Sequence, residues 1–330
     1  MTKHVIPLGG ITAAAVILAS SASAEIKVND NFAVAGYIVG SATLTDLDKA
    51  TTNSTMDVDA MKLVSTAKFE KVSGTLSLFS GSSDDPVFLD AYATYDAGNG
   101  VTITGGKFLS WLGYEAFDPI NMTQITYAWN TVPGGMSVIG IPAYHSGLKV
   151  ETTSEGYSAG FAVLDSNNYL TPYYKGDGHL DHGAGFEAYA KFTSGKFTTF
   201  LGAAYDKDDW ADLATYSGNL WIQYVDGANT FAVEGSYANL EPKIGDTTAS
   251  YFWQLFARHA FSDKFALSGR VAGGVAESKP TDDEYLKLTV APAWTITPNL
   301  EIVGEISYTT FDGTGYDDGL FGGLQARFKF

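Results

Sequence analysis

The sequence GLFGGLQARFKF, residues 319–330, alternates apolar and polar side chains up to its last residue. Successive side chains of a β-strand point to opposite faces, so this stretch has one apolar and one polar face. The apolar face holds Leu324, Ala326, Phe328 and Phe330, and the polar face holds Gln325, Arg327 and Lys329. A strand that separates lipid from water needs this pattern. The stretch therefore predicts the closing strand of a transmembrane β-barrel.

The same two-residue period recurs along the chain between turn-forming residues. In residues 57–71, Lys62, Thr66 and Lys68 share one face, which a water-filled lumen tolerates and a packed core does not. We predict about 16 strands on this pattern. They span residues 31–44, 57–71, 75–80, 87–97, 101–107, 143–153, 157–164, 183–193, 197–205, 215–225, 230–240, 249–259, 265–275, 284–295, 300–309 and 319–330.

The connections between these segments alternate between short and long. Outer-membrane barrels have this asymmetry, with tight turns at the periplasmic rim and larger loops outside. An even number of strands also leaves both chain ends on the periplasmic side. We therefore predict an all-β fold, a transmembrane antiparallel up-and-down β-barrel that encloses an aqueous channel.

One connection, residues 107–142, is much longer than the others and contains Pro119, Pro133, Trp111 and Trp129. A compact domain rarely keeps so long a connection without a function for it. We expect it to fold into the barrel as a constriction loop. The alternative is an ordinary outer loop that lies over the rim.

Residues 1–24 have the composition of a secretory signal peptide. A short basic start precedes an apolar run over residues 5–18, and Ala22-Ser23-Ala24 supplies the small residues of a cleavage site. We expect cleavage after Ala24, leaving residues 25–330 as one domain in a bacterial outer membrane. Loss of Lys3 would leave 19 basic against 37 acidic residues, a net charge of −18. The chain has no cysteine, so an exported fold must depend on a large core or a closed sheet.

Residues 106–115, GKFLSWLGYE, are followed by Pro119 and Asn121 and later by YHSGL at residues 144–148. This arrangement resembles the OmpL-like beta-barrel porin family (porin-2 type). In that family a GKF…GYE segment closes a strand and opens a long loop, and a P…HxG segment resumes the barrel. The resemblance implies a channel-forming outer-membrane protein and does not specify a solute.

Eight residues are candidates for a pore constriction. They are Trp111, Tyr114, Glu115 and Asp118 of the long connection, with Lys62, Lys68, Arg258 and Arg270 on the polar faces of strands. Acids and bases opposed across a narrow pore create a transverse field, and rings of charge set ion selectivity. The alternative is that these charges are solvated and steer nothing.

Other sites are weaker. Acidic clusters in the predicted outer loops could bind calcium or bridge to lipopolysaccharide, although a solvated acidic rim explains them more simply. His179 and His182 with Asp177 and Asp181 could hold a metal, but nothing fixes their geometry. His145 and Ser146 are adjacent on a predicted strand and would point to opposite faces, which prevents a base–nucleophile pair. We predict no cofactor, no metal site and no enzymatic activity.

We therefore expect a diffusion porin for small hydrophilic solutes and ions, with a weak preference for cations. A narrower sugar-type channel lined by aromatics such as Phe117 and Tyr127 is one alternative, and a plugged structural or adhesive barrel is another. The expected partners are outer-membrane lipid, lipopolysaccharide, and the barrel assembly machinery through the strand that ends at Phe330. A homotrimer is left open, and no nucleic-acid partner is expected.

Overall fold

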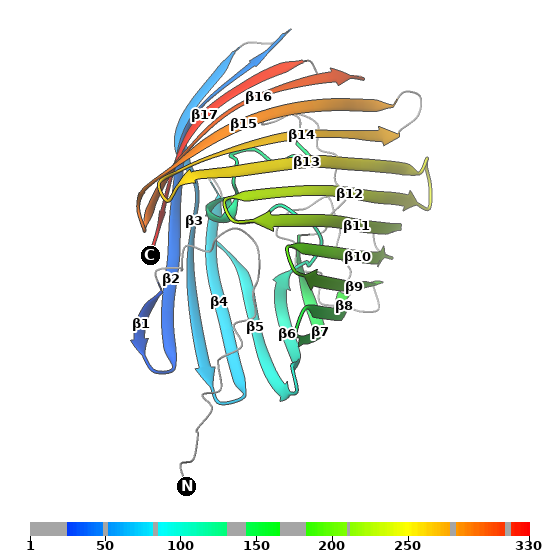
Figure 1. The fold of residues 1–330 in the computed structure, drawn as a ribbon. Coiled ribbons are helices and arrows are strands. Elements are labelled where there is room, and N and C mark those ends of the chain that lie inside the picture. Colours follow the sequence, from blue (N-terminus) through cyan, green and yellow to red (C-terminus); the bar gives the residue numbers. More distant parts are fainter. Residues whose placement is uncertain are drawn as a thin grey trace.

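The computed structural model describes residues 25–48, 52–81, 85–130, 143–165, 183–209, 212–277, 282–313 and 318–330. Within these ranges, 17 strands form a single antiparallel sheet (Figure 1). The strands are β1 (Ile26–Asn29), β2 (Phe32–Leu47), β3 (Asn53–Phe69), β4 (Val72–Gly81), β5 (Val87–Gly98), β6 (Val101–Leu109), β7 (Tyr144–Ser154), β8 (Tyr157–Asp165), β9 (Gly183–Ser194), β10 (Phe197–Asp208), β11 (Leu213–Asp226), β12 (Asn229–Pro242), β13 (Thr248–Ser262), β14 (Phe265–Glu277), β15 (Asp283–Thr297), β16 (Leu300–Asp312) and β17 (Gly319–Lys329).

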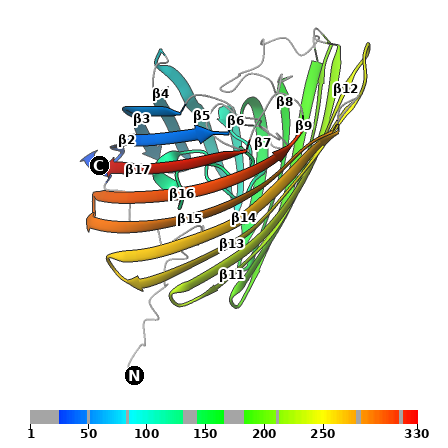
Figure 2. The same ribbon diagram turned by 90° about the horizontal axis from the view of Figure 1, so that it is seen from above.

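Strands β2 to β17 close into a 16-stranded barrel, because each pairs with its neighbours in sequence and β17 pairs with β2. The closing register runs from Gly319 opposite Leu47 to Lys329 opposite Tyr37. Figure 2, seen from above, shows the strands curving around a common interior. The predicted all-β antiparallel barrel is confirmed, including the closing role of the last strand.

Strand β1 was not predicted. It pairs with the start of β2, where Ile26 lies opposite Val34, whereas β17 pairs with the remainder of β2. Phe330 lies between them. The Gly36 amide donates to the Phe330 carbonyl at 2.7 Å, and the Phe330 amide donates back to the Gly36 carbonyl at 2.9 Å. The first and last strands of the described chain thus meet end to end along one edge of β2.

The short connections are tight turns in which the backbone enters the left-handed region. Asn99 and Gly100 have φ of 53° and 77°, the two positive values that a type I′ hairpin requires and that Asn-Gly favours. A Cβ on Gly100 would also strike the Thr153 carbonyl of the neighbouring strand. The predicted alternation of short and long connections is confirmed by the strand bounds.

Two predicted loops, at residues 46–56 and 206–214, are shorter than expected because the strands continue into polar sequence. Near the loop that joins β2 to β3, the hydroxyl groups of Thr43 and Thr55 lie 2.7 Å apart. Backbone pairing and hydroxyl contacts extend these strands even though the apolar alternation has stopped.

The two faces of the sheet have opposite chemistry. On β12, Phe231 and Val233 are 50 % and 44 % exposed, while Glu234 is only 2 % exposed. Apolar side chains therefore face outward, where lipid would cover them, and polar side chains face the interior of the barrel. In the described part of the chain, no helix has the length and apolarity needed to cross a membrane.

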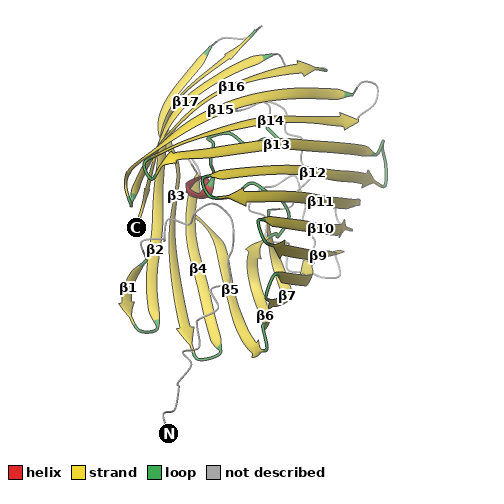
Figure 3. Ribbon diagram, in the orientation of Figure 1, coloured by secondary structure: helices red, strands yellow, loops and turns green. Residues whose placement is uncertain are grey.

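The interior is occupied by residues 110–130, which we call the inner segment. It contains the 3-10 helix η1 (Pro119–Asn121), the single helix among the described residues, which Figure 3 shows within the ring of strands. Residues 131–142, the remainder of the predicted constriction loop, lie outside the described residues.

Candidate functional site

The inner segment follows the inward face of the barrel wall in two arms. Residues 110–117, the first arm, contact strands from β7 to β14. The chain then crosses to β2 and β3, and residues 122–130, the second arm, return along β17, β16 and β15. Most strands of the barrel therefore hold part of the inner segment.

Two buried carboxylates hold the first arm by its backbone. The Glu187 carboxylate on β9 accepts hydrogen bonds from the Ser110 hydroxyl at 2.9 Å and the Trp111 amide at 2.6 Å. The Glu234 carboxylate on β12 accepts one from the Tyr114 amide at 2.8 Å. An irregular segment has amide groups without strand partners, and these inward acids satisfy them.

Neutral amides complete this anchor. The Asn219 side chain donates to Glu234 at 2.7 Å and accepts from the Gly113 amide at 3.1 Å. Gln254 donates to the second Glu234 oxygen at 2.5 Å. Because both oxygens are hydrogen-bonded, the carboxylate is fixed in orientation without a lysine or arginine partner in the described chain.

Aromatic rings seat the beginning of the inner segment. The Trp111 ring lies 4.8 Å from the Tyr189 ring, and its indole N–H donates to Glu151 at 3.0 Å. It passes over Gly160, where a Cβ would come within 2.9 Å of the indole. The wall thus offers a bare backbone position for this ring.

Tyr114 packs edge-on against Trp221, with ring centroids 5.6 Å apart, and lies 6.0 Å from Phe256. Burial raises the pKa of Tyr114 to about 12, so its hydroxyl is neutral at physiological pH. This hydroxyl accepts a hydrogen bond from the Gln223 side chain at 2.9 Å.

Two of the predicted acid–base combinations are in direct contact. Glu115 forms an ion pair with Arg270 of β14, and its other oxygen accepts the Ala128 amide at 2.8 Å, which ties the two arms together. Asp118 pairs with Lys62 of β3 at 3.1 Å. Each of these two acids is thus in direct contact with a base of the barrel wall.

The other two predicted bases lie elsewhere. Lys68 and Arg258 are close to the tight-turn rim, opposite Ser73 and Ser268 respectively. In the part of the chain that the structure describes, neither side chain forms a hydrogen bond or ion pair with the inner segment.

Sequence reasoning missed the groups that hold the second arm. Glu305 of β16 accepts the amides of Ile125 at 2.5 Å and Thr126 at 3.0 Å. The Arg327 guanidinium of β17 donates to the carbonyl of Gln124 at 2.8 Å and also to the Met122 carbonyl. The acid on β16 thus meets amides of the second arm, and the base on β17 meets its carbonyls.

Lys287 of β15 is the last of these anchors. Its ammonium donates to the Thr126 hydroxyl at 2.8 Å and to the carbonyls of Tyr127 at 3.1 Å and Asn130 at 2.9 Å. A signal for these residues exists in the sequence, because each is a charge on the polar face of its strand. They are Glu187, Glu234, Lys287, Glu305 and Arg327.

The weaker candidates separate from this site. His179 and its neighbours lie outside the described residues. The His145 ring nitrogen lies 3.4 Å from Glu187, inside the barrel. Ser146 is the next residue of β7. It lies on the same face as Leu148, which is exposed on the outside of the barrel. Within the described ranges, no group of three or more His, Asp or Glu side chains is arranged to hold a metal ion.

The closed barrel, its apolar exterior and an inner segment along its wall define the class of outer-membrane β-barrel porins. The family described as "Putative beta-barrel porin-2, OmpL-like" matches residues 46–330, and the chain belongs to this family. A comparison with curated proteins gives no match.

Solved structures of similar fold include outer-membrane proteins and a porin. OmpT of Vibrio cholerae in a trimer form has a TM-score of 0.64 at 13% identity, over 91% of this chain and 100% of that chain. An anion-selective porin from Comamonas acidovorans has a TM-score of 0.67 at 13% identity, over 91% and 99%. The outer membrane channel DcaP of Acinetobacter baumannii has a TM-score of 0.65 at 13% identity, over 91% and 97%. At this identity the likeness concerns the fold.

Proposed function

We propose that the protein is a diffusion porin, a water-filled outer-membrane channel for small hydrophilic solutes, in which the inner segment is the constriction. The observation that supports this most strongly is the attachment of both arms to inward polar side chains of the strands. A lid over the rim would leave those side chains to water. The predicted site residues Trp111, Tyr114, Glu115 and Asp118 all belong to this segment.

A weak preference for cations is part of the proposal. Two of the wall bases are neutralised by acids of the inner segment, because Glu115 pairs with Arg270 and Asp118 pairs with Lys62. Glu187 and Glu234 have no lysine or arginine partner in the described chain, and the chain as a whole is acidic, with a net charge of −17. An acidic interior raises the local concentration of cations.

Export and assembly follow the same proposal. We expect residues 1–24 to be removed after Ala24 and the mature barrel to reside in the outer membrane, in contact with lipopolysaccharide. The likeness to the trimer form of OmpT supports a test for a homotrimer.

The test is single-channel conductance of the refolded protein in a planar bilayer, beside a variant that lacks residues 111–129. Larger steps in the deletion variant are expected, because removing the inner segment widens the narrowest part. Equal steps would remove the constriction role and keep the channel. A folded barrel without steps would overturn the channel itself and favour a structural role.

A further inference from the structure

The fixed charge of the barrel differs between its two ends. We call the end with the long connections the loop mouth and the end with the tight turns the turn mouth. Acids occur around the loop mouth on strand ends and connections that are far apart in the ring. Examples are Asp48, Asp206, Asp246, Glu277 and Asp312.

The bases at the loop mouth are few and already engaged. In the described part of the chain they are Lys107, Lys207 and Lys243. The Lys207 ammonium lies 2.6 Å from the Asp209 carboxylate, and the Lys243 ammonium lies 2.7 Å from that of Asp212. Lys107 donates to the Phe88 carbonyl at 2.8 Å. The loop mouth therefore keeps a net negative charge.

The turn mouth has bases on its inward face. Lys68 of β3, Lys191 of β9 and Arg258 of β13 each lie within four residues of a strand end at a tight turn. Each has the same parity as a buried polar side chain of its own strand, so all three face the interior. Their strands are six and four places apart in the ring, so these bases surround the mouth. We call these three residues the basic ring.

The basic ring is not neutralised by its surroundings. Within the described residues, none of its three side chains forms a hydrogen bond or an ion pair. Lys27 of β1 and Lys329 of β17 add two further inward bases at this mouth. The acids that face the same space are Glu25, Asp96 and Glu301, and the last of them pairs with Arg327 at 3.5 Å. The inner surface of the turn mouth is therefore positive.

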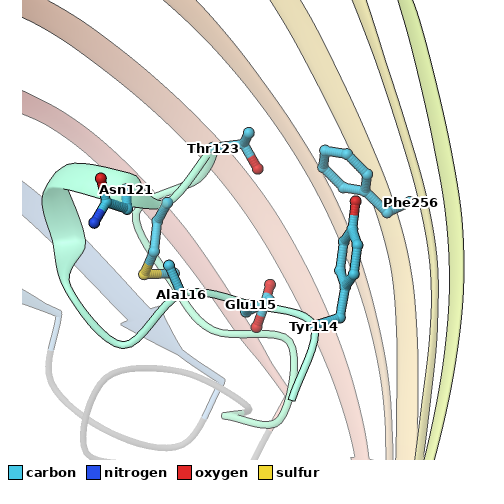
Figure 4. Close-up of a pocket in the computed structure, with 7 residues that line it drawn as sticks. Tyr114, Glu115, Ala116, Asn121, Thr123 and Phe256 are labelled. Atoms are coloured by element: carbon cyan, nitrogen blue, oxygen red, sulfur yellow. The ribbon is translucent and has the colours of Figure 1, made fainter. Parts of the chain in front are cut away.

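The inner segment between the two mouths adds little net charge of its own. Glu115 pairs with Arg270, and Asp118 pairs with Lys62. Figure 4 shows the Glu115 carboxylate in a small pocket beside the Tyr114 ring. The difference in charge between the loop mouth and the turn mouth is therefore preserved across this segment.

We propose that the channel conducts ions better in one direction than in the other, and that the basic ring determines this asymmetry. When the loop mouth is at positive voltage, cations enter through the acidic mouth and anions through the basic mouth, so both ions accumulate in the pore. At the opposite voltage each ion must enter through a mouth of its own sign, and the pore is depleted of both. This inference rests on the proposed channel and adds a preferred direction to it.

The test is the current through single channels of the full mature protein at equal and opposite voltages. The variant that removes the basic ring combines Lys68→Gln, Lys191→Gln and Arg258→Gln. The matched control combines Lys71→Gln, Lys196→Gln and Lys264→Gln. It removes the same charge at the same rim, from exposed residues that lie in the turns themselves.

The expected ratio of the larger to the smaller wild-type current is about two at low salt, because a fixed potential of about kT changes local ion concentrations two- to threefold. The ratio should approach one between 0.1 M and 1 M salt, since the screening length falls from about 10 Å to about 3 Å. The control should keep the wild-type ratio. The variant without the basic ring should lose most of it and prefer cations more strongly.

The direction of the larger current is read with Ile244→Cys. Ile244 is 90% exposed in a long connection, and the chain has no cysteine of its own. A fluorescent maleimide that cannot cross the membrane, added to one compartment, labels the channel only when the loop mouth faces that compartment. We expect the larger current when the loop mouth is positive.

Open channels with equal currents at both voltages would overturn the inference and leave the proposed porin intact. A larger current with the turn mouth positive would also overturn it. A ratio that survives removal of the basic ring, or that falls equally in the control, would show that these three residues do not determine the asymmetry. Failure of the porin itself is distinct, because a folded barrel would then give no current at either voltage.

Discussion

Glu115 shows how single side chains determine the path of the inner segment. Its carboxylate bonds Arg270 on the wall and Ala128 on the returning arm, so one residue fixes three pieces of chain. The Arg270 side chain is fully buried and also contacts Thr126 at 3.4 Å. A buried guanidinium that loses its carboxylate is left with an uncompensated charge.

Glu115→Gln is therefore expected to destabilise the protein by about 3 kcal/mol. Replacing both partners, as Glu115→Gln with Arg270→Met, should cost less than the sum of the two single changes. The measurement is urea unfolding of the refolded barrel in lipid vesicles. Lys196→Met, at an ion pair with Asp226 whose side chains are 53% and 47% exposed, is the control and should change nothing measurable. Equal effects of Glu115→Gln and Lys196→Met would contradict the anchoring role.

At the scale of single residues, the sequence predicted which charged residues face the interior better than it predicted their contact partners. Lys62 and Arg270 were recognised by their polar-face parity, and the structure pairs them with Asp118 and Glu115. Lys68 has the same parity, yet it lies near the tight-turn rim. Parity tells which face a side chain occupies, whereas the height that the inner segment reaches is set by long-range packing.

At the scale of elements, the seam between β2 and β17 depends on a close contact at one glycine. The Phe330 ring lies against Gly36, where a Cβ would come within 2.6 Å of the ring and 2.7 Å of the Lys62 carbonyl. Because Gly36 has no side chain, Phe330 can occupy the position between β1 and β17 along the edge of β2.

We expect Gly36→Val to destabilise the barrel by roughly 1–3 kcal/mol, the usual cost of forcing a side chain into filled space. Gly322→Val is the matched control, because a Cβ on Gly322 of β17 meets nothing within 4 Å. The measurement is the folded fraction on an unheated electrophoresis gel, together with the urea midpoint. A Gly36→Val protein that behaves like Gly322→Val would show that the seam tolerates a displaced Phe330.

The strands themselves could be predicted because each carries its own alternation and turn residues. Strand β1 was missed because it spans only Ile26–Asn29 and precedes the region of clear alternation. The ends of β2 and β10 were missed because polar residues continue the pairing there. Backbone hydrogen bonds at these positions depend on the neighbouring strand, which the local sequence does not reveal.

At the scale of the whole molecule, the balance of charge should decide which ions pass. We expect a salt gradient across a bilayer to give a reversal potential of the sign for cation preference. The preference should weaken between 0.1 M and 1 M salt, since the screening length falls from about 10 Å to about 3 Å. A reversal potential of the opposite sign would contradict the argument from the acidic interior. A cation preference that does not change with salt concentration would indicate that ions are selected by groups in direct contact with them.

The sequence also predicted the overall shape. Sixteen segments that each have one polar and one apolar face can turn all their polar faces toward one interior by closing into a barrel. It did not predict that the inner segment would reach both halves of the barrel. Trp111 lies near β8, whereas Gln124 and Ile125 are held by β17 and β16. Such a path joins residues that are distant in sequence and has no local pattern.

The end-to-end meeting of β1 and β17 along β2 has a consequence for the order of folding. Beyond the short stretch beside β1, this edge of β2 pairs with residues 319–329, so ring closure joins segments separated by almost the entire chain. The second arm likewise finds Lys287, Glu305 and Arg327 only once the last three strands exist. Ring closure and the seating of the second arm both depend on the last three strands, so we expect both to come late in folding.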